Sequence, residues 1–268
     1  MAKEVFDMTR KLVESIALAG LEKYRFSKSA PARYMSRAAV AGAFIFIGTL
    51  ISCLCAAWFY SDNLPVAKLI GAASFSAALI LVVLLGGELF TGCSLVMGIS
   101  LYEETVSPAA LLRVWVMSYV GNFIGILILS LLLAGSGASR DLLSAYLVIC
   151  VPAKLTAPWY GLLLKGVLCN FLVCLGVFAG FKLQSECGKA LAIVLVITTF
   201  VLCGLEHSIA NMAFFSLYAL LIPGADFAGM GWNLLWVTLG NILGGAVLLG
   251  LPLWCCAEKK PAEGALGQ

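Results

Sequence analysis

Six apolar stretches constrain this chain more than any other feature of its sequence. They cover about residues 36–60, 66–98, 109–134, 157–181, 188–222 and 231–256. Each is long enough for an α-helix to cross the hydrocarbon core of a bilayer, which takes roughly 20 residues. The chain is 62% hydrophobic and only 12% charged, with a mean hydropathy of +1.03, and a soluble domain of this size could not bury that much apolar surface. The sequence therefore predicts an all-α membrane protein with six transmembrane helices.

The second and fifth stretches are too long for one simple span, and a polar interruption divides each of them. The first interruption, 86–92, has the sequence GGELFTG, and the second, 204–211, has the sequence GLEHSIAN. Unwound backbone at membrane depth is tolerated only where protein or a water-filled cavity satisfies its polar groups. Helix N-termini exposed at such a break carry partial positive charge. We therefore predict that both spans are broken and that the breaks form an anion pore or binding site.

A short motif recurs downstream of each broken span. It has the sequence GNFIG at 121–125 and GNILG at 240–244. Spans one to three thus match spans four to six, and a repeat of three spans must insert in opposite orientations. We predict a transmembrane channel domain over 35–256, built from two inverted three-helix repeats at 35–134 and 157–256.

Lysine and arginine residues predict the orientation. Eight of the 17 lie at or before the start of the first span, and Lys259 and Lys260 follow the last. The positive-inside rule and an even number of spans place both termini in the cytoplasm. Residues 1–34 form a charged, amphipathic segment, with a helix expected from Glu4 to Tyr24 that lies on the membrane surface or packs beneath the bundle. Residues 257–268 are expected to be a cytoplasmic tail.

The residues within the interruptions carry the chemistry. His207 is the only histidine of the chain, and an imidazole can exchange a proton with the anion of a weak acid. A lone buried histidine is often a satisfied core residue, but this one lies in a break beside Glu206 and Asn211. Thr91, in the other break, offers a hydroxyl across the pore. Glu88 and Glu206 are carboxylates at membrane depth, which are costly unless paired or protonated. Structural roles, such as orienting the histidine, are favoured for both over a direct proton relay.

Several other classes of protein are disfavoured. The ten cysteines lie mostly in apolar stretches and form no C-x-x-C motif, which argues against a disulfide framework or a metal site. One histidine cannot supply both axial ligands of a bis-histidine haem. We expect no metal, no cofactor and no enzymatic activity. The basic N-terminal segment is explained by topology and by anionic lipid headgroups, not by nucleic acid.

Two strings resemble the formate–nitrite transporter family, and the similarity extends over about 35–254. They are GELFTG at 87–92 and EHSIANM at 206–212. Two further stretches, KGVLCN at 165–170 and NLLWVTLGN at 233–241, are similar to the nitrite channels of this family more than to its formate channels. The resemblance favours nitrite over formate as the substrate, with formate or hydrosulfide transport as alternatives on the same scaffold.

The resemblance also implies a homopentamer of aquaporin-like protomers in the bacterial inner membrane, each with its own pore for small inorganic or organic monovalent anions. The vestibule lysine of the family corresponds to Lys154, a flexible loop carries Thr91, and Asn170 belongs to the same pore. Lys165 lies within the fourth span, where anion attraction and pairing at a protomer interface are both open. Two hydrophobic constrictions are implied, a cytoplasmic slit and an outer slit. Their residues are Leu79, Leu89 and Phe90, and Phe75, Val173 and Phe200, respectively.

These features lead to a hypothesis for transport. Lys154 and the vestibule concentrate the anion, the apolar slits exclude the charged species, and His207 protonates the anion so that the neutral acid crosses. The rival is an open channel that passes the anion itself while His207 is merely positively charged. A neutral-solute pore of the aquaporin kind is the alternative from another class, but its paired Asn-Pro-Ala loops are missing from this sequence.

Overall fold

The computed structural model describes residues 2–257, with side chains from residue 9 onward, and this part of the chain is built of helices and short connections. The predicted all-α class is confirmed. In chain order the elements are α1 (Ala2–Ser29), α2 (Pro31–Phe59), α3 (Leu64–Leu85), α4 (Phe90–Tyr102), α5 (Pro108–Ser136), α6 (Arg140–Cys150), α7 (Pro152–Leu155), α8 (Trp159–Lys182), α9 (Glu186–Leu202), α10 (Ser208–Leu221), α11 (Phe227–Ile242), the π-helix η1 (Leu243–Gly250) and α12 (Leu251–Cys255).

Five helical segments are long and apolar enough to cross a membrane. They are α2, α3, α5, α8 and the continuous run Phe227–Cys255, which joins α11, η1 and α12. The helices α4 and α10 are apolar but shorter, and α9 has 17 residues. The second predicted stretch is therefore divided into α3 and α4, and the fifth into α9 and α10.

Side-chain caps explain where several helices begin. Asn63 caps α3, Ser107 caps α5 and Asp226 caps α11, each by accepting a backbone N–H of the first turn. Such a cap satisfies one of the four N–H groups that have no partner within the helix. Because of the Asp226 cap, the last span begins at Phe227 rather than at the predicted residue 231.

Three elements were not expected from the sequence. The helices α6 and α7 lie in the connection between the third and fourth predicted spans, where α6 buries Leu143 and Leu147 on one face. These two residues are four apart, so they lie on one side of a helix. The π-helix η1 packs against α4, where the hydroxyl of Tyr102 donates to the carbonyl of Ala246 at 3.1 Å. Hydropathy alone does not distinguish a π-helix from an α-helix.

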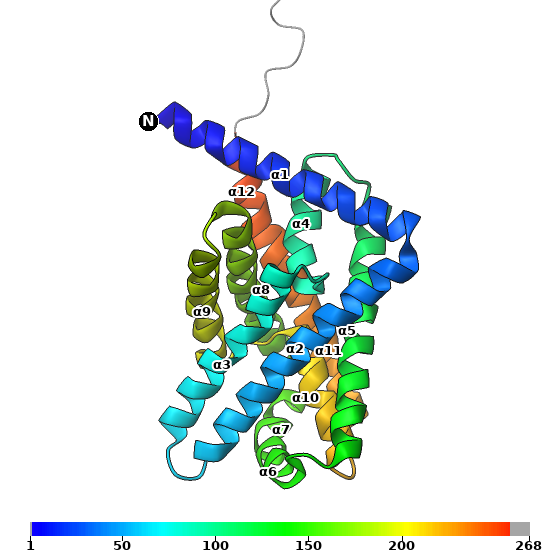
Figure 1. The fold of residues 1–268 in the computed structure, drawn as a ribbon, viewed down its shortest axis with the longest axis vertical. Coiled ribbons are helices and arrows are strands. Elements are labelled where there is room, and N and C mark those ends of the chain that lie inside the picture. Colours follow the sequence, from blue (N-terminus) through cyan, green and yellow to red (C-terminus); the bar gives the residue numbers. More distant parts are fainter. Residues whose placement is uncertain (1, 258–268) are drawn as a thin grey trace, which may run out of the picture.

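The N-terminal helix packs against the bundle, which is one of the two placements expected for it. It is longer than predicted and runs from Ala2 to Ser29. Its apolar face, with Val13 and Ile16, is buried against α4. Arg10 adds a two-pronged contact with the Glu103 carboxylate, at 2.9 and 2.5 Å. In the ribbon view α1 crosses the end of the bundle where α12 also lies, and α6 and α7 lie at the opposite end (Figure 1).

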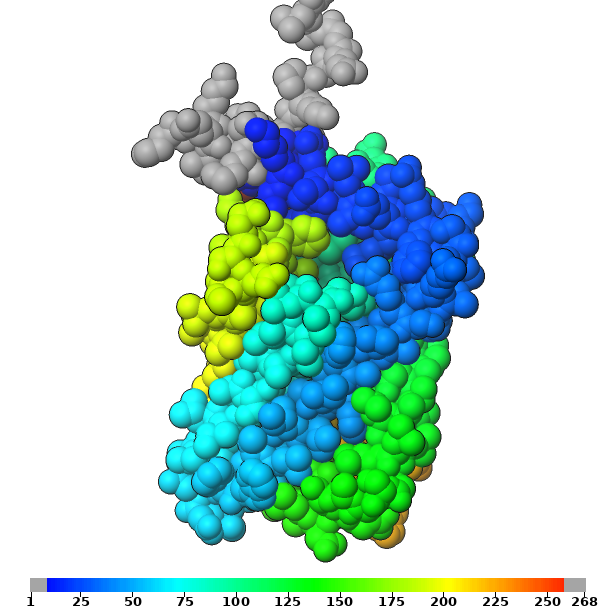
Figure 2. All heavy atoms as spheres, viewed as in Figure 1, coloured from blue at the N-terminus to red at the C-terminus, as the bar shows by residue number. Residues whose placement is uncertain are grey.

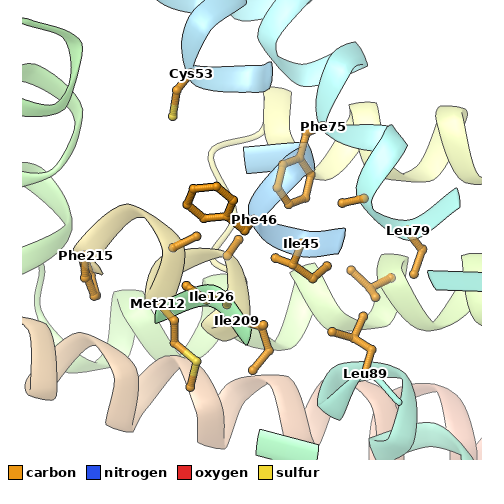
Figure 3. Close-up of a cluster of buried hydrophobic side chains, with 14 of the residues drawn as sticks. Ile45, Phe46, Cys53, Phe75, Leu79, Leu89, Ile126, Ile209, Met212 and Phe215 are labelled. Atoms are coloured by element: carbon orange, nitrogen blue, oxygen red, sulfur yellow. The ribbon is translucent and has the colours of Figure 1, made fainter. Parts of the chain in front are cut away.

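The main apolar core lies between the two broken spans. Buried side chains from α2, α3 and α10 converge there on the segment before α4, so that both half-helix breaks are held by the same packed cluster (Figure 3). Members of this cluster are Ile45, Phe46, Phe75, Leu79, Leu89, Ile126, Ile209, Met212 and Phe215.

Glycines of the recurring motif bring helix backbones into direct contact. A Cβ added at Gly125 of α5 would overlap the carbonyl of Ala39 in α2. A Cβ added at Gly244 would likewise overlap the carbonyl of Val167 in α8. These atoms belong to backbone and cannot move aside as a side chain could. The close approach of α5 to α2, and of η1 to α8, therefore requires glycine.

We predict that Gly125→Ala destabilises the protein. Overpacking of this kind costs about 1–3 kcal/mol, so thermal unfolding in detergent should occur several degrees lower than for the wild type. The matched control is Gly135→Ala on the same helix, where an added Cβ meets nothing within 4 Å. This control should be neutral or slightly stabilising, because alanine favours helix. Equal melting temperatures for the two variants would contradict the close-contact explanation.

Candidate functional site

The first break separates α3 from α4. The α3 helix ends at Gly86, whose φ of +77° lies in the left-handed region that favours glycine. Asn122 of α5 then holds the break. Its Oδ1 accepts the Phe90 N–H at 2.9 Å, and its Nδ2 donates to the carbonyls of Ala38 at 2.8 Å and Glu88 at 2.9 Å.

The second break is held in the same way by Asn241 of α11. Its Oδ1 accepts the Ser208 N–H at 2.8 Å, and its Nδ2 donates to the carbonyls of Gly166 at 2.9 Å and Glu206 at 3.0 Å. Gly204, with φ of +64°, supplies the left-handed residue in this break. Each asparagine of the two GN motifs thus joins an unwound segment to a neighbouring spanning helix through three hydrogen bonds.

Both breaks are shorter than predicted. The helix α4 begins at Phe90 and α10 at Ser208, so Thr91 and Asn211 lie in first helical turns and not in unwound chain. The expected flexible loop around Thr91 is likewise wrong, because Thr91 belongs to α4. The asparagine acceptors explain the difference: each satisfies the first N–H of the helix that follows, so that the helix can begin earlier.

The two breaks meet at Thr91 and His207. The Thr91 Oγ1 lies 2.9 Å from His207 Nε2, and His207 is only 3% exposed. The other ring nitrogen, Nδ1, accepts the backbone N–H of Ala210 at 3.0 Å, which makes His207 the N-cap of α10. Because Nδ1 is an acceptor, the proton of the neutral imidazole is on Nε2, which donates to the threonine hydroxyl. The Phe200 ring stacks on the imidazole with a centroid distance of 6.2 Å.

Glu206, Lys154, Asn211 and Asn233 form a closed network beside the second break. Lys154 Nζ donates to Glu206 Oε2 at 2.8 Å and to Asn211 Oδ1 at 3.1 Å. Asn211 Nδ2 donates to Glu206 Oε2 at 2.7 Å and to Asn233 Oδ1 at 2.8 Å. Asn233 Nδ2 in turn donates to the Lys154 carbonyl at 3.0 Å. Glu206 is thus a paired carboxylate, in agreement with the cost of an unpaired charge at this depth.

Glu88 has a corresponding partner at the first break. Lys23 Nζ, from α1, donates to Glu88 Oε2 at 2.6 Å. The Tyr34 hydroxyl lies 3.3 Å from the same oxygen and 2.8 Å from the Ser118 hydroxyl. Burial opposes the charge of Lys23, but the neighbouring Cys93 and Glu88 side chains offset burial and raise the pKa of Lys23 above its ordinary value. Each break therefore contains a glutamate paired with a lysine from a helix outside the broken spans.

Two cavities approach the breaks from opposite ends of the bundle. The Lys154 cavity, of about 530 Å³, is lined by Lys154, Glu206, His207, Asn211, Phe75 and Phe200, among others. The Lys23 cavity, of about 230 Å³, is lined by Lys23, Arg37, Leu89, Cys93, Phe181 and Lys189, among others. The space-filling view shows a hollow beneath α1, between α3 and the yellow-green segment around residue 185 (Figure 2). His207 opens onto the first cavity and Leu89 onto the second.

The six residues expected in constrictions are all buried, but they differ in what they face. Phe75 and Phe200 line the Lys154 cavity, and their rings meet edge to face at 5.7 Å. Leu89 lines the Lys23 cavity, and Leu79 and Val173 lie in the core cluster. Phe90 contacts aromatic rings of α5, with its centroid 5.0 Å from that of Tyr119 and 6.5 Å from that of Trp115.

Two further candidates also have defined places. Asn170 Nδ2 donates to the Thr91 carbonyl at 3.2 Å, to Ser94 Oγ at 2.7 Å and to the Asn241 carbonyl at 2.6 Å. It therefore joins the first turn of α4 to α11 directly behind Thr91. Lys165 is exposed and lines the Lys154 cavity.

Sequence reasoning missed several members of the site. Asn122 and Asn241 were noticed only within a motif for helix packing, although a buried amide in an apolar run is itself a signal that backbone groups need partners. Asn233, Tyr34 and Lys23 gave no local signal, because distant parts of the chain bring them to the breaks. Among the described side chains, no group of three or more His, Cys, Asp or Glu residues is arranged to hold a metal ion.

The comparison with known proteins identifies the family of this chain. The sequence model of the family described as "Formate/nitrite transporter" matches residues 10–255. The chain belongs to the formate/nitrite transporter family. A relative within it, the nitrite transporter NirC of Salmonella typhimurium, is 34% identical over 252 residues, which cover 91% of each chain. The resemblance inferred from the sequence is confirmed, and a member of this family is a transporter or channel and not an enzyme.

Two solved structures are similar to this formate/nitrite transporter. One, an "FNT family ion channel", superposes with a TM-score of 0.84 at 31% identity, covering 92% of this chain and 99% of the other. The second, a "Pentameric formate channel with formate bound", has a TM-score of 0.73 at 29% identity, covering 85% of this chain and 98% of the other.

We predict that Lys154 and Glu206 are energetically coupled. Glu206 is buried and Lys154 is mostly buried, with side-chain exposures of 6% and 19%, so removal of one partner leaves the other charge poorly compensated and costs up to the roughly 3–5 kcal/mol typical of fully buried pairs. Lys154→Met and Glu206→Gln should each lower the midpoint of thermal unfolding in detergent, and the double variant should lose less than the sum of the two. A double variant with strictly additive losses would show that the two side chains act independently. The partly exposed Arg10–Glu14 pair, at 3.0 Å, provides the control cycle with small coupling.

Proposed function

We propose that this chain is a pore for small monovalent anions of weak acids, with nitrite favoured over formate and hydrosulfide. The observation that carries the proposal is the Thr91–His207 contact, where two helix breaks meet between two cavities that are each lined by lysines. The helices α4 and α10 begin at these breaks, and the partial positive charge of their N-termini favours a nearby anion. The nitrite transporter among its relatives supports nitrite as the first candidate.

We propose six transmembrane crossings in two inverted repeats, 35–134 and 157–256, within a channel domain of 35–256. The equivalent bonds of Asn122 and Asn241 support the repeat. The position of α1 and α12 at one end of the bundle supports an even number of crossings (Figure 1). By the positive-inside rule that end is cytoplasmic, and the protein belongs in the bacterial inner membrane. The segments 1–34 and 257–268 are then cytoplasmic; of the latter, 258–268 lie outside the described residues. The pentameric formate channel, to which the fold is similar, supports a homopentamer.

The proposed mechanism couples anion passage to a proton at His207. At rest the imidazole is neutral, because Nδ1 is occupied by the Ala210 N–H. An arriving anion favours the imidazolium, which forms when Nδ1 takes up a second proton from the Lys154 cavity and gives up its bond to the Ala210 N–H. Nε2 then passes its proton to the anion, which crosses the apolar contact of Phe75 and Phe200 as the neutral acid. A bare anion would meet a high desolvation cost there. Loss of the Nδ1 proton and uptake of one proton at Nε2 then restore the resting tautomer and the Ala210 bond.

The rival mechanism is an open channel in which His207 is permanently cationic and the anion itself passes. Such a histidine could not accept the Ala210 N–H at Nδ1, because both nitrogens of an imidazolium are donors. The observed 3.0 Å bond therefore favours the coupled mechanism. A neutral-solute pore is disfavoured, because the chain belongs to the formate/nitrite transporter family.

We predict that His207→Asn abolishes the pH dependence of uptake. Asparagine is a good N-cap, so it can accept the Ala210 N–H and preserve the start of α10 while removing the titratable group. In proteoliposomes, wild-type uptake of nitrite, formate and hydrosulfide should rise when the outside is acidified, and the variant should show a flat profile. Full pH-coupled uptake by the variant would contradict the mechanism. If none of the three anions moves through the wild type, the proposed function itself is wrong.

A further inference from the structure

The Lys154 cavity contains more positive charge than its network can neutralise. Its lining includes three lysines, Lys68, Lys154 and Lys165, against one carboxylate, Glu206. Only Lys154 is paired, at 2.8 Å from Glu206. Lys68 and Lys165 are exposed, and neither forms an ion pair with any described side chain from residue 9 to residue 257.

Lys154 is fixed in place by the second break. Its Nζ donates to Glu206 and Asn211 and lies 5.4 Å from the centroid of the Phe214 ring. Its carbonyl also accepts a bond from Asn233. The carboxylate of Glu206 cancels most of the field of Lys154 at longer distances. The contacts of Lys154 therefore hold the break together, and this lysine contributes little to the attraction of a distant anion.

Lys68 and Lys165 come from different walls of the same cavity. Lys68 lies in the first turns of α3, and Lys165 lies in the second turn of α8, where its carbonyl accepts the Glu206 N–H at 3.5 Å. They therefore border a space that also contains His207 and is walled by apolar rings. A cavity with low-dielectric walls and charges of one sign focuses the field and raises the local concentration of counter-ions.

We propose that Lys68 and Lys165 are the anion-capture residues of this mouth, whereas Lys154 is a positioning residue for the second break. This inference rests on the proposed function. It assigns the electrostatic attraction of the anion to two lysines that lie outside the network of Glu206, Lys154, Asn211 and Asn233. The ligand class is a small monovalent anion that passes on to Thr91 and His207. Capture acts on the encounter rate, so it affects transport below saturation and is screened by salt over a Debye length of about 10 Å at 0.1 M.

The test is nitrite uptake by proteoliposomes with Lys68→Gln, Lys165→Gln and the double variant, at low and high concentrations of an impermeant salt. At low salt the double variant should raise KM roughly threefold to tenfold, with the maximal rate unchanged. At high salt it should match the wild type. The double replacement by arginine should restore the wild-type KM, because arginine keeps the charge.

The matched control is Lys182→Gln, at the other end of α8, which lines neither the Lys154 cavity nor the Lys23 cavity. It should leave KM unchanged at both salt concentrations. A wild-type KM for the double variant at low salt would overturn the inference while leaving the proposed function intact. A loss that persists at high salt, or a double variant that no longer elutes as the wild-type oligomer, would also overturn it in favour of a structural role. Absence of uptake by the wild type would instead remove the proposed function on which the inference rests.

Discussion

Unpaired backbone groups within a bilayer are the constraint on which the rest of this structure depends. A helix that stops at membrane depth exposes N–H and carbonyl groups that lipid cannot satisfy. Here two buried amides, Asn122 and Asn241, satisfy them with three hydrogen bonds each. Each amide also fixes the unwound segment to a neighbouring helix. The breaks are therefore rigid enough to hold functional groups in defined positions.

The ion pairs at the two breaks follow from the same constraint. A glutamate in each unwound segment would be costly alone, and each has a lysine from a helix outside the broken spans. Lys23 comes from α1 at 2.6 Å, and Lys154 from α7 at 2.8 Å. The short helices at both ends of the bundle are thereby linked to its centre. A change in α1 or α7 can alter the geometry of a break without a contact to the transported anion.

Side chains from the two broken spans meet at the Thr91–His207 pair, next to both breaks. His207 caps α10 through Nδ1 and contacts Thr91 through Nε2. One side chain thus has a structural role and, in the proposed mechanism, a chemical role as well. In that mechanism the cap on α10 favours the neutral imidazole at rest and ties the proton transfer to the start of this helix.

Much of the fold could be predicted from the sequence, because apolar length is a direct requirement of the bilayer. The two interruptions pointed to the breaks and to the residues within them, whereas the GN motifs pointed only to a repeat and to close helix packing. The predicted start of each half-helix was wrong, because the true start depends on an asparagine from another span, Asn122 or Asn241, that accepts the first N–H of the half-helix. The π-helix η1 was missed because hydropathy does not distinguish it from an α-helix. The helix α6 was missed because its 11 residues are too few to span a bilayer, although Leu143 and Leu147 are spaced for one helix face. The family gave Lys154 a role in attracting anions, but its contacts with Glu206 and Asn211 became visible only in three dimensions.

The proposed mechanism depends on His207 resting as a neutral imidazole that carries its proton on Nε2. Because the chain has one histidine, nitrogen-15 NMR of protein labelled only at histidine, in lipid and without a histidine tag, reports on this single ring. We expect an unprotonated Nδ1 and a protonated Nε2 at neutral pH in the absence of transported anions. Two protonated nitrogens, or a proton on Nδ1 alone, would contradict it and would favour the permanently charged open channel or a different arrangement of the second break.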